Sequence, residues 1–467
     1  MVDLLIKDGY VITMNSKREM LFCDIYINDG KIVALGKSDK KARRTIDGKN
    51  CVVLPGLINT HTHLYQSLIE GIGYDMHFEP WNWRYLVPIV SKISPSHSYV
   101  SAKLASLEMI QSGTTTICDH WYMHTDFNNI REASRALIEA GLSAEMVYGL
   151  LDNGFAGETS SDESDMTMLH SKEDLIKDFY DYYENYHNKD NISVAIGIGS
   201  TPDASFSLLK QSKEIADKLS INMSTHVAGW QDVLAYTYKE YGMRDAEFYY
   251  KNNLMGKNSM FVHTVWLTPN EINMLKETGT KSIHCPAANS QLGYGIAPVA
   301  EMLSQNIPVG LATDGAASYT YDLFEMMRLT SYLQKQKHQS SDVFSAEQAL
   351  EMATINGAKV LNKENEIGSI EIGKRADIIL LDFNSPHLLF SNRIVPKIVY
   401  SASAKDVKTT IVNGKVLMDN FKVEALDVEK TLEEVRIAQN QLLESAGPET
   451  HRLINAKWPT NGTYWKL

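Results

Sequence analysis

The stretch CVVLPGLINTHTH (51–63) joins an apolar run to two histidines that lie one residue apart. The run is short, rich in Val, Leu and Ile, and bounded by polar residues, which is typical of a buried strand. Residues i and i+2 of a strand point to one face, so His61 and His63 project together. Two imidazoles on one face provide half of a zinc site. The pair alone is more typical of ordinary strand-end histidines, so further ligands are needed before a metal site is indicated.

Seven more short apolar runs follow this one, and longer helical patterns such as SYVSAKLASLEMIQSG (98–113) separate them. Eight strands that alternate with helices predict a (β/α)8 TIM barrel of the α/β class. The length agrees, because 253 residues separate His61 from Asp314 and this fold typically takes about 250 residues. The seven further strands are expected at 114–119, 143–150, 192–199, 221–226, 260–263, 281–285 and 307–314.

The two ends of the chain differ from the middle. Both alternate apolar and polar residues, and the turn signals D-G or N-G occur in KDGY, NDGK, IDGK and VNGK. We therefore expect both termini to build one small composite β-sandwich domain. The predicted units are the N-terminal part of the sandwich, the metal-dependent barrel, the C-terminal part of the sandwich, and a C-terminal helix with an aromatic tail, at residues 1–56, 57–366, 367–425 and 426–467.

The composition narrows the classes of partner. A net charge of -12 provides no basic surface for nucleic acid, so a small molecule is the expected partner. The four cysteines lack C-x-x-C spacing, which indicates a reducing compartment. We find neither a signal peptide nor an apolar run of membrane-spanning length, and we expect a cytoplasmic protein without a membrane partner.

The polar segment 153–174 is expected to be a mobile loop on the active-site side. The tail residues Trp458, Tyr464 and Trp465 are expected to pack on the body or across a subunit interface.

Chemistry in a (β/α)8 barrel gathers at the carboxyl ends of the strands. Groups that can bind a metal end four of the predicted strands here, namely His61 and His63, His226, His263 and Asp314. Five such groups form a far more specific pattern than H-x-H, and they indicate a metal site. His284 also ends a strand, but its place beside Cys285 and Pro286 favours a role in the core. His120 and His124 follow the second strand and could face the pocket.

Several motifs together resemble the amidohydrolase superfamily. Within it they resemble the deaminase and chlorohydrolase branch, which includes S-adenosylhomocysteine and methylthioadenosine deaminases, 8-oxoguanine and melamine deaminases and triazine chlorohydrolases. The resemblance covers nearly the whole chain and rests on LPGLINTHTHLYQ, STHVA, VHTV, HCPAANSQLGYGIAPV, VGLATDGAAS and IGSIEIGKRADIILLD.

This resemblance implies one divalent metal ion, usually zinc and sometimes iron, and a homo-oligomer, a dimer or larger. The implied metal ligands are His61, His63, His226 and Asp314, with His263 against the hydrolytic water or the substrate. The fourth strand ends AIGIGSTP without a lysine that could bridge a second metal. A metal lowers the pKa of a water towards ~7, Asp314 can take its proton, and His263 can stabilise the charge that develops.

The pattern departs from the family after the fifth strand. The related deaminases have H-x-x-E there, and the glutamate protonates a ring nitrogen, but this chain has Gly229 at that position. Glycine carries no proton, so another acid must act or the reaction needs less acid catalysis. Asp232 is one candidate acid, and Gln231 could hydrogen-bond the substrate. A ring-opening C–N hydrolase and a metal-binding barrel with lost or altered catalysis stay open as alternatives.

Other positions suggest the substrate. Pro80 stands where nucleoside deaminases of this branch have a glutamate for ribose, and Tyr148 stands near an expected arginine, which disfavours ribosylated or carboxylate-bearing substrates. We therefore predict an aminohydrolase of a small nitrogen heterocycle, an oxopurine, pterin or triazine. Its substrate-binding residues are expected to be Gln66, Trp81, His120 and Tyr319.

Overall fold

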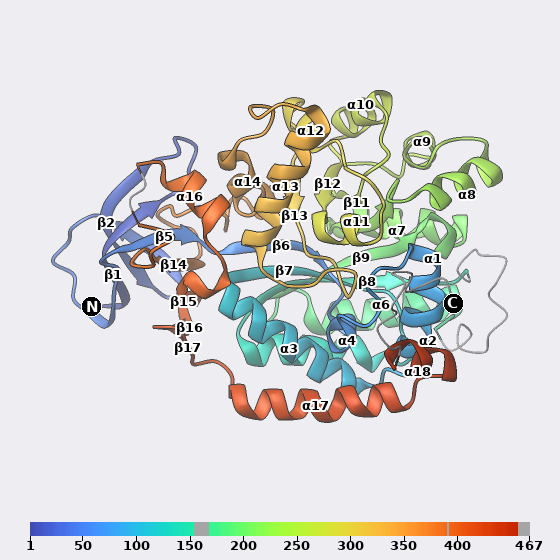
Figure 1. The fold of residues 1–467 in the computed structure, drawn as a ribbon, viewed down its shortest axis with the longest axis horizontal. Coiled ribbons are helices and arrows are strands. Elements are labelled where there is room, and N and C mark those ends of the chain that lie inside the picture. Colours follow the sequence, from blue (N-terminus) through green and yellow to red (C-terminus); the bar gives the residue numbers. More distant parts are fainter. Residues whose placement is uncertain (154–167, 390–391, 456–467) are drawn as a thin grey trace, which may run out of the picture.

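The computed structural model of this chain describes residues 1–153, 168–389 and 392–455. The described strands form two sheets, one with eight strands and one with nine. Figure 1 shows the nine-stranded sheet on the left and the helix-covered eight-stranded sheet on the right. Most of the segment 153–174 and the aromatic residues of the C-terminal tail lie outside the described residues, so the expectations for them stay predictions.

The eight-stranded sheet is the predicted (β/α)8 barrel. Its strands follow one another in sequence order, and every neighbouring pair is parallel. The first and last strands meet where the Asp314 N–H donates to the His61 carbonyl at 3.1 Å and the Thr60 hydroxyl donates to the Leu311 carbonyl at 2.9 Å. The strands are β6 (Leu57–Thr62), β7 (Thr114–Trp121), β8 (Ser143–Leu150), β9 (Ile192–Ser200), β10 (Met223–Val227), β11 (Ser259–His263), β12 (Lys281–His284) and β13 (Val309–Leu311).

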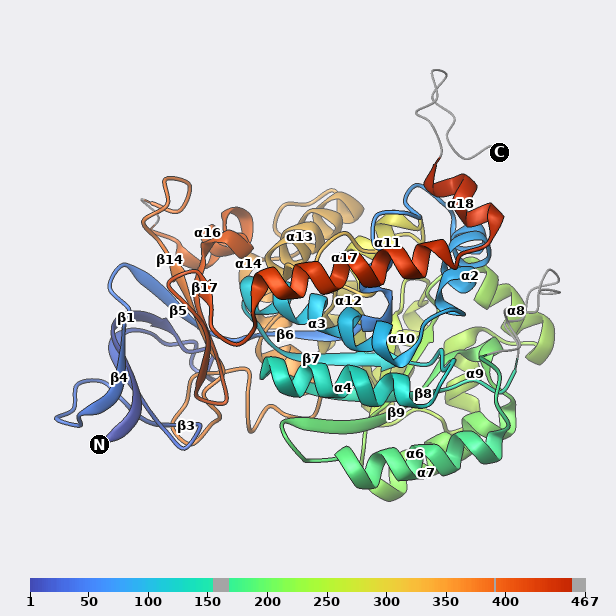
Figure 2. The ribbon, with the colours of Figure 1, turned by 90° about the horizontal axis from the view of Figure 1, so that it is seen from below.

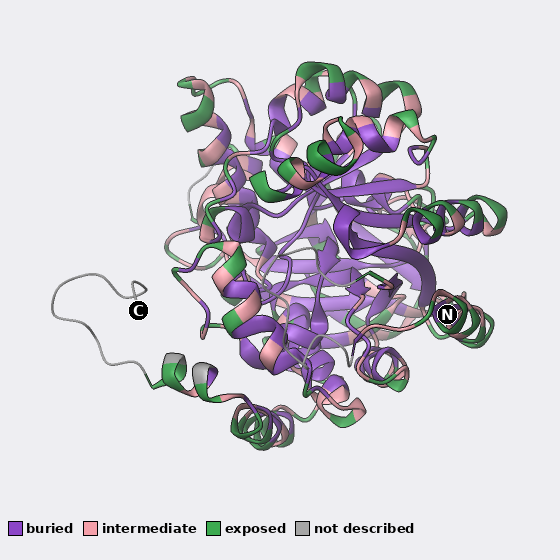
Figure 3. Ribbon diagram, turned by 90° about the vertical axis from the view of Figure 1, so that its right-hand side faces the viewer, coloured by how far each residue is buried: buried purple, intermediate pink, exposed green. Residues whose placement is uncertain are grey.

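Helices surround this barrel, and Figure 3 shows buried strands inside a ring whose outer surfaces are exposed. The longer helices are α3 (Pro95–Ser112), α4 (Asn128–Ala140), α6 (Lys172–Tyr186), α7 (Phe206–Leu219), α8 (Gln231–Tyr241), α10 (Pro269–Thr278) and α13 (Leu323–His338). Shorter ones are η1 (Leu64–Ile69), α1 (Phe78–Trp81), η2 (Asn82–Leu86), α2 (Val87–Val90), η3 (Thr201–Asp203), α9 (Asp245–Lys251), α11 (Pro286–Gln291), α12 (Val299–Ser304), α14 (Ala346–Met352), α15 (Ile355–Val360), α16 (Ile394–Ser401) and η4 (Ala404–Asp406).

Local sequence signals explain where α3 begins and ends. The Ser94 hydroxyl accepts the His97 backbone N–H, and Pro95 occupies the first turn, where its missing N–H costs nothing. Gly113 ends the helix at a φ of 82°, a left-handed conformation that glycine adopts without a steric penalty. The next residue starts β7, so this one turn connects a helix of the outer ring to a strand of the barrel.

The sequence predicts one strand over the apolar run 51–61, and the structure corrects this prediction. The run splits at Gly56 into β5 (Cys51–Pro55) in the nine-stranded sheet and β6 in the barrel. A Cβ atom at Gly56 would lie 2.1 Å from the Thr115 hydroxyl oxygen, so the chain passes between the two sheets where no side chain fits. His61 belongs to β6, whereas His63 follows the end of that strand.

The nine-stranded sheet combines both ends of the chain, as predicted. Its strands are β1 (Val2–Ile12), β2 (Met20–Asn28), β3 (Lys31–Leu35), β4 (Ala42–Asp47), β5, β14 (Ile378–Asp382), β15 (Val407–Val412), β16 (Lys415–Asp419) and β17 (Lys422–Val423). The antiparallel pair β5 and β14 joins the two ends. Ile32 of β3 and Ile411 of β15, from opposite parts of the strand order, share one hydrophobic core. The sheet therefore bends over its own core as a sandwich does.

The turn signals mark real turns, with one exception. NDGK and VNGK form the connections β2–β3 and β15–β16, where Asp29, Gly30, Asn413 and Gly414 all have positive φ. KDGY instead lies inside β1, where the pairing with β2 shifts register at Gly9. This D-G pair therefore makes a bulge rather than the expected turn.

The C-terminal part of the described chain consists of α17 (Val428–Glu444) and α18 (Pro448–Ile454). Figure 2 shows α17 lying along the outside of the barrel across α3. The Lys103 ammonium group of α3 contacts the Glu434 carboxylate of α17 at 2.6 Å, and Val435 and Leu442 of α17 are buried. Among the described residues, none of the helices has the length and apolarity needed to span a membrane.

Candidate active site

Four buried side chains meet at the carboxyl ends of the barrel strands. The Nε2 atoms of His61 and His63 lie 3.2 Å apart, and the Nε2 atom of His226 lies 3.3 Å from that of His61. The Asp314 carboxylate lies 3.5 Å from His61 Nε2 and 3.3 Å from His63 Nε2. One ligand atom from each of the four residues falls within 4.8 Å of the others. The barrel therefore brings together the predicted ligands from three different strand ends.

Neighbouring groups point these ligand atoms inwards. The Nδ1–H group of His63 donates to the His120 carbonyl at 2.8 Å, and that of His226 donates to the Gly199 carbonyl. Each of these two rings is therefore left with Nε2 facing the cluster, as metal-binding histidines usually are.

The protonation states of the cluster also suit a metal. Burial lowers the pKa of His63 to about 3 and the pKa of His226 well below its usual value. Burial alone would raise the pKa of Asp314, but the neighbouring imidazoles hold it below the usual range for a carboxyl group. Neutral imidazoles and an ionised carboxylate are the forms that bind a metal. The donor set therefore fits one divalent cation.

A second grouping of potential ligands shares Asp314 and adds His263 and Cys285. Burial raises the pKa of the Cys285 thiol well above its usual value, so the thiolate that a metal requires is disfavoured. The first four residues are the better metal centre for this reason.

His263 lies beside the cluster, and a hydrogen bond to Asn289 fixes its ring. Its Nδ1–H group donates to the Asn289 side-chain oxygen at 2.9 Å, and its Nε2 atom lies 4.0 Å from the Asp314 carboxylate. His263 and Asp314 have φ values of 71° and 70°, and Ala228 near His226 has 50°. Non-glycine residues seldom adopt this conformation, and it is found disproportionately at functional sites.

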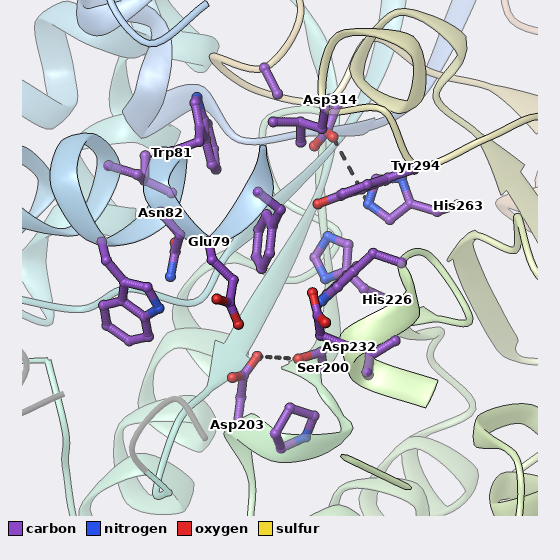
Figure 4. Close-up of a pocket in the computed structure, with 18 of the residues that line it drawn as sticks. Glu79, Trp81, Asn82, Ser200, Asp203, His226, Asp232, His263, Tyr294 and Asp314 are labelled. Carbon is purple, nitrogen blue, oxygen red and sulfur yellow. Dashed lines mark hydrogen bonds and ion pairs between the residues drawn. The ribbon is translucent and has the colours of Figure 1, made fainter. Parts of the chain in front are cut away.

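A pocket opens directly onto this cluster (Figure 4). Aromatic side chains supply much of its wall, namely Phe78, Trp81, Trp83, Tyr122, Trp230, Tyr236 and Tyr294. Besides Asp314, three carboxylates line it, from Glu79, Asp203 and Asp232. No lysine or arginine is among the described residues that line the pocket. The cavity thus offers flat apolar surfaces for a ring and several hydrogen-bond acceptors.

Two of the four expected substrate-binding residues line the pocket, and the other two lie outside its lining. Gln66 and Trp81 line the pocket, and the Ala316 N–H donates to the Gln66 side-chain oxygen at 2.8 Å. His120 is outside the lining because its ring stacks behind that of His226, with centroids 5.6 Å apart. Tyr319 is also outside it: this side chain is 46% exposed, and its hydroxyl donates to Glu325. The loop after Asp314 turns Tyr319 towards solvent, contrary to our expectation.

Several residues of the pocket were missed by the sequence analysis. Asp203 follows barrel strand β9 and Tyr122 follows β7, and this position could have identified them, because the ends of all barrel strands converge on one face. Tyr294 and Trp230 lie in loops, where the sequence carries no comparable signal.

Gly229 leaves the pocket without a side chain at the position of the family's glutamate. A Cβ atom there would lie 3.1 Å from the His263 ring, which is tighter than ordinary packing. Asp232, the candidate replacement, lines the pocket but belongs to its exposed rim. Gln231 is not among the described lining residues.

The sequence profile of the amidohydrolase family matches residues 52–417. The chain belongs to the amidohydrolase family. The match spans the barrel and most of the strands that the C-terminal part adds to the second sheet. The histidine and aspartate cluster of this amidohydrolase lies within it.

Relatives of this amidohydrolase align along nearly its whole length. A 5'-deoxyadenosine deaminase of Methanosarcina acetivorans is 34% identical over 451 residues, which cover 96% of this chain and 100% of the relative. A 5-methylthioadenosine/S-adenosylhomocysteine deaminase of Thermoanaerobacter pseudethanolicus is 32% identical over 449 residues, covering 95% and 100% of the two chains.

Solved structures confirm the fold. A zinc-bound adenosine deaminase of Xanthomonas campestris superposes with a TM-score of 0.88 at 22% identity, over 94% of this amidohydrolase and 98% of that chain. An atrazine chlorohydrolase of Arthrobacter aurescens, complexed with zinc, gives a TM-score of 0.86 at 24% identity, over 93% and 100% of the two chains.

Proposed function

We propose that this chain is a metal-dependent aminohydrolase that replaces an exocyclic amine of a nitrogen heterocycle with a hydroxyl group. The observation that carries the proposal is the convergence of His61, His63, His226 and Asp314 at the inner end of an aromatic pocket. The deaminase activity of the relatives named above supports it, since they share about a third of the residues over nearly the whole chain.

The four ligand residues would hold the metal, for which we propose zinc. A divalent metal bound there supplies Lewis acidity and lowers the pKa of the water that it binds. The neighbouring imidazoles hold the pKa of Asp314 below its usual range, so its carboxylate can accept a proton from the attacking water. The Nε2 atom of His263, fixed by Asn289, can stabilise charge that develops on the attacked group.

The pocket supports a purine-type ring as the substrate. Trp230 and Tyr294 stack with centroids 5.5 Å apart, and Phe78 lies 4.6 Å from Trp230, so one wall of the pocket is a continuous aromatic surface. Glu79, next to Pro80, lines the pocket with a carboxylate that could accept sugar hydroxyl groups. We therefore add adenine nucleosides to the oxopurines, pterins and triazines expected from the sequence.

Two further properties belong to this proposal. We propose a cytoplasmic protein, because all four cysteines of the chain are free thiols in the structure. We also propose a homo-oligomer, as the family resemblance implies. Size-exclusion chromatography with light scattering would measure the latter directly.

Gly229 favours a second candidate, a site that binds a heterocycle without removing an amine. Loss of the family's glutamate removes the group expected to protonate the ring. Such a site would either open a ring by C–N hydrolysis or hold its ligand unchanged.

Ammonia release distinguishes these functions. Zinc-loaded protein would be incubated with 5'-deoxyadenosine, adenosine, guanine, a pterin and melamine, with Asp314→Ala as the inactive control. We expect ammonia from at least one adenine nucleoside and none from the control. Loss of heterocycle absorbance without ammonia would indicate ring opening. Binding without any product would overturn the aminohydrolase proposal.

A further inference from the structure

Removal of an amine requires a proton for the ring, and Gly229 cannot supply it. The inference drawn from this gap rests on the proposed aminohydrolase function. Three carboxylates besides the ligand Asp314 line the pocket, from Glu79, Asp203 and Asp232. Their burial and their fixation by neighbouring groups distinguish them.

Asp203 differs from the other two by its burial. Its residue is 5% exposed, whereas Glu79 and Asp232 are exposed residues. An acid that donates a proton at neutral pH has to be neutral there, and burial favours the neutral form of a carboxyl group. Burial raises the pKa of Asp203 to about 7, although hydrogen bonds from Ser200 act in the opposite direction.

The position of Asp203 is fixed by the end of β9. The Ser200 hydroxyl donates to its Oδ2 atom at 2.8 Å, and the turn η3 carries the residue back over the strand end. A Cβ atom at Gly199 would lie 2.4 Å from the same oxygen, so only glycine allows the carboxyl group to lie there. The Gly199 carbonyl in turn accepts the Nδ1–H of the metal ligand His226. Asp203 is thus anchored on the strand that orients this ligand.

Figure 4 shows the direction of this side chain. The Asp203 carboxyl group points into the cavity, between Glu79 and Asp232, while His226 and Asp314 lie on the opposite side. A ring placed in the cavity therefore has the metal centre on one side and Asp203 on another. The charged and titratable groups near Asp203 are Tyr122, Tyr236, Tyr249 and the two exposed carboxylates.

We propose that Asp203 is the general acid of this enzyme and protonates a ring nitrogen in place of the glutamate that Gly229 lacks. Ser200 is its positioning residue, because the Ser200 hydroxyl holds the oxygen that does not donate. The family's deaminases place this acid on the loop after the fifth strand, whereas here it follows the fourth strand.

The substrate of this step contains an N=C–NH2 unit. The water oxygen bonds to the carbon while one water proton passes to Asp314 and the Asp203 proton passes to the ring nitrogen. The C–NH2 bond then breaks, and the amine leaves as ammonia with the proton from Asp314. The remaining hydroxyl proton returns to Asp203, which leaves a C=O group beside the ring N–H. One water is consumed and one ammonia is released.

Matched variants test this assignment in the full-length, zinc-loaded protein. Asp203→Asn keeps the shape and the hydrogen bond from Ser200 but cannot donate an acidic proton. Asp322→Asn is the control, because Asp322 is a partly buried acid that caps α13 outside the pocket and asparagine also caps helices. Asp232→Asn tests the rival acid. Zinc content is measured for every variant, so that loss of metal is not mistaken for loss of a proton donor.

The pH dependence of the reaction provides a readout that a structural role would not move. We expect Asp203→Asn to lower kcat for an adenine nucleoside by about 100-fold or more, with zinc content unchanged. In the wild type, kcat/KM should fall as the pH rises above about 7, because Asp203 then loses the proton that it donates, and Asp203→Asn should lack this fall. The same pH profile in both proteins, or a larger loss in Asp232→Asn than in Asp203→Asn, would overturn the proposal.

Infrared spectroscopy tests the proton on Asp203 even if the wild type deaminates none of the nucleosides. That outcome by itself would contradict only the proposed function. Infrared difference spectra of wild type minus Asp203→Asn at pH 6 are expected to show a protonated carboxyl band. This band should disappear on titration to pH 9, and Asp322→Asn should retain it. Absence of the band at pH 6 would show that Asp203 holds no proton to donate, and the proposal would fail.

Discussion

Asn289 sets the orientation of His263 through a single hydrogen bond. Its side-chain oxygen accepts the Nδ1–H group, which leaves Nε2 facing Asp314. We predict that Asn289→Ala lowers kcat by about 10- to 100-fold, the usual effect of removing a residue that orients a site histidine. Steady-state kinetics on the preferred substrate measures this.

Metal content and Asn289→Asp serve as controls for that prediction. Asn289 contacts His263 and is not one of the four ligands, so the variant should bind as much zinc as the wild type. Asn289→Asp retains an oxygen acceptor and should lose less activity than Asn289→Ala. Equal losses in both variants, or an apo protein, would show that Asn289 acts on something other than the orientation of His263.

The residues of the candidate metal centre could be predicted because the ends of the strands can be located from the sequence. His226 and Asp314 terminate apolar runs, and the barrel brings all such ends to one face. The orientation of Tyr319 was not predictable, since it depends on how one loop turns after Asp314. The position of His120 behind His226 was not predictable either, because the alternation of residues along β7 does not show which side chain of another strand packs against His120.

At the scale of elements, the connection between β5 and β6 depends on Gly56. A methyl group there would overlap the Thr115 side chain, at 2.1 Å from its oxygen. We predict that Gly56→Ala lowers the free energy of unfolding by about 1–3 kcal/mol, the typical cost of overpacking a core. Urea denaturation measures this. Gly447→Ala is the control, because a Cβ atom there meets nothing within 4 Å, and a comparable loss in both variants would contradict the role of Gly56.

Asp245 connects three elements at the base of the site. Its carboxyl group accepts the Ala228 N–H at 2.7 Å and the hydroxyl protons of Thr201 and Thr237 at 2.6 and 3.3 Å. Burial nevertheless raises the pKa of Asp245 to about 6. Between about pH 4 and pH 6 the folded state therefore binds more protons at this residue than the unfolded state does.

The stability of the protein should consequently fall as pH rises through that window. We predict that the free energy of unfolding of wild type, minus that of Asp245→Asn, decreases by on the order of 2 kcal/mol from pH 4 to pH 6. Urea denaturation at several pH values measures the difference. A difference that is constant or that rises with pH would contradict the raised pKa.

The sequence predicted the number and order of the barrel strands, and it failed at two boundaries. The sequence predicts a single strand in place of β5 and β6, because only Pro55 and Gly56 interrupt an otherwise continuous apolar run. The predicted last strand, 307–314, is also longer than β13. Hydrophobic alternation locates strands well, but it does not report the sheet to which each one belongs. That choice depends on partners far away in the sequence.

At the scale of the whole molecule, α17 ties the C-terminal part of the chain to the barrel. Leu442 is completely buried, whereas Ile437 on the same helix is 53% exposed. We predict that Leu442→Ala lowers the free energy of unfolding by about 2–5 kcal/mol. Ile437→Ala should have little effect, and urea denaturation compares the two. Similar losses in both variants would contradict the packing of α17 on the barrel.

The joining of the two chain ends in one sheet could be predicted because both ends carry strand alternation that the barrel does not use. The order of the nine strands could not be predicted, because β1 pairs with three strands, β2, β4 and β5, and alternation does not identify the partners of a strand. The same limit applies to α17: its apolar side indicates burial, but the partner helix α3 lies more than 300 residues away.

Metal content is the most direct test of the central claim, that one divalent metal is held by three histidines and an aspartate. Elemental analysis would be carried out on the wild type and on His226→Ala, before and after zinc loading. We predict about one equivalent in the loaded wild type and little in the variant. A wild type that stays metal-free after loading, or a variant that binds as much zinc, would contradict the account.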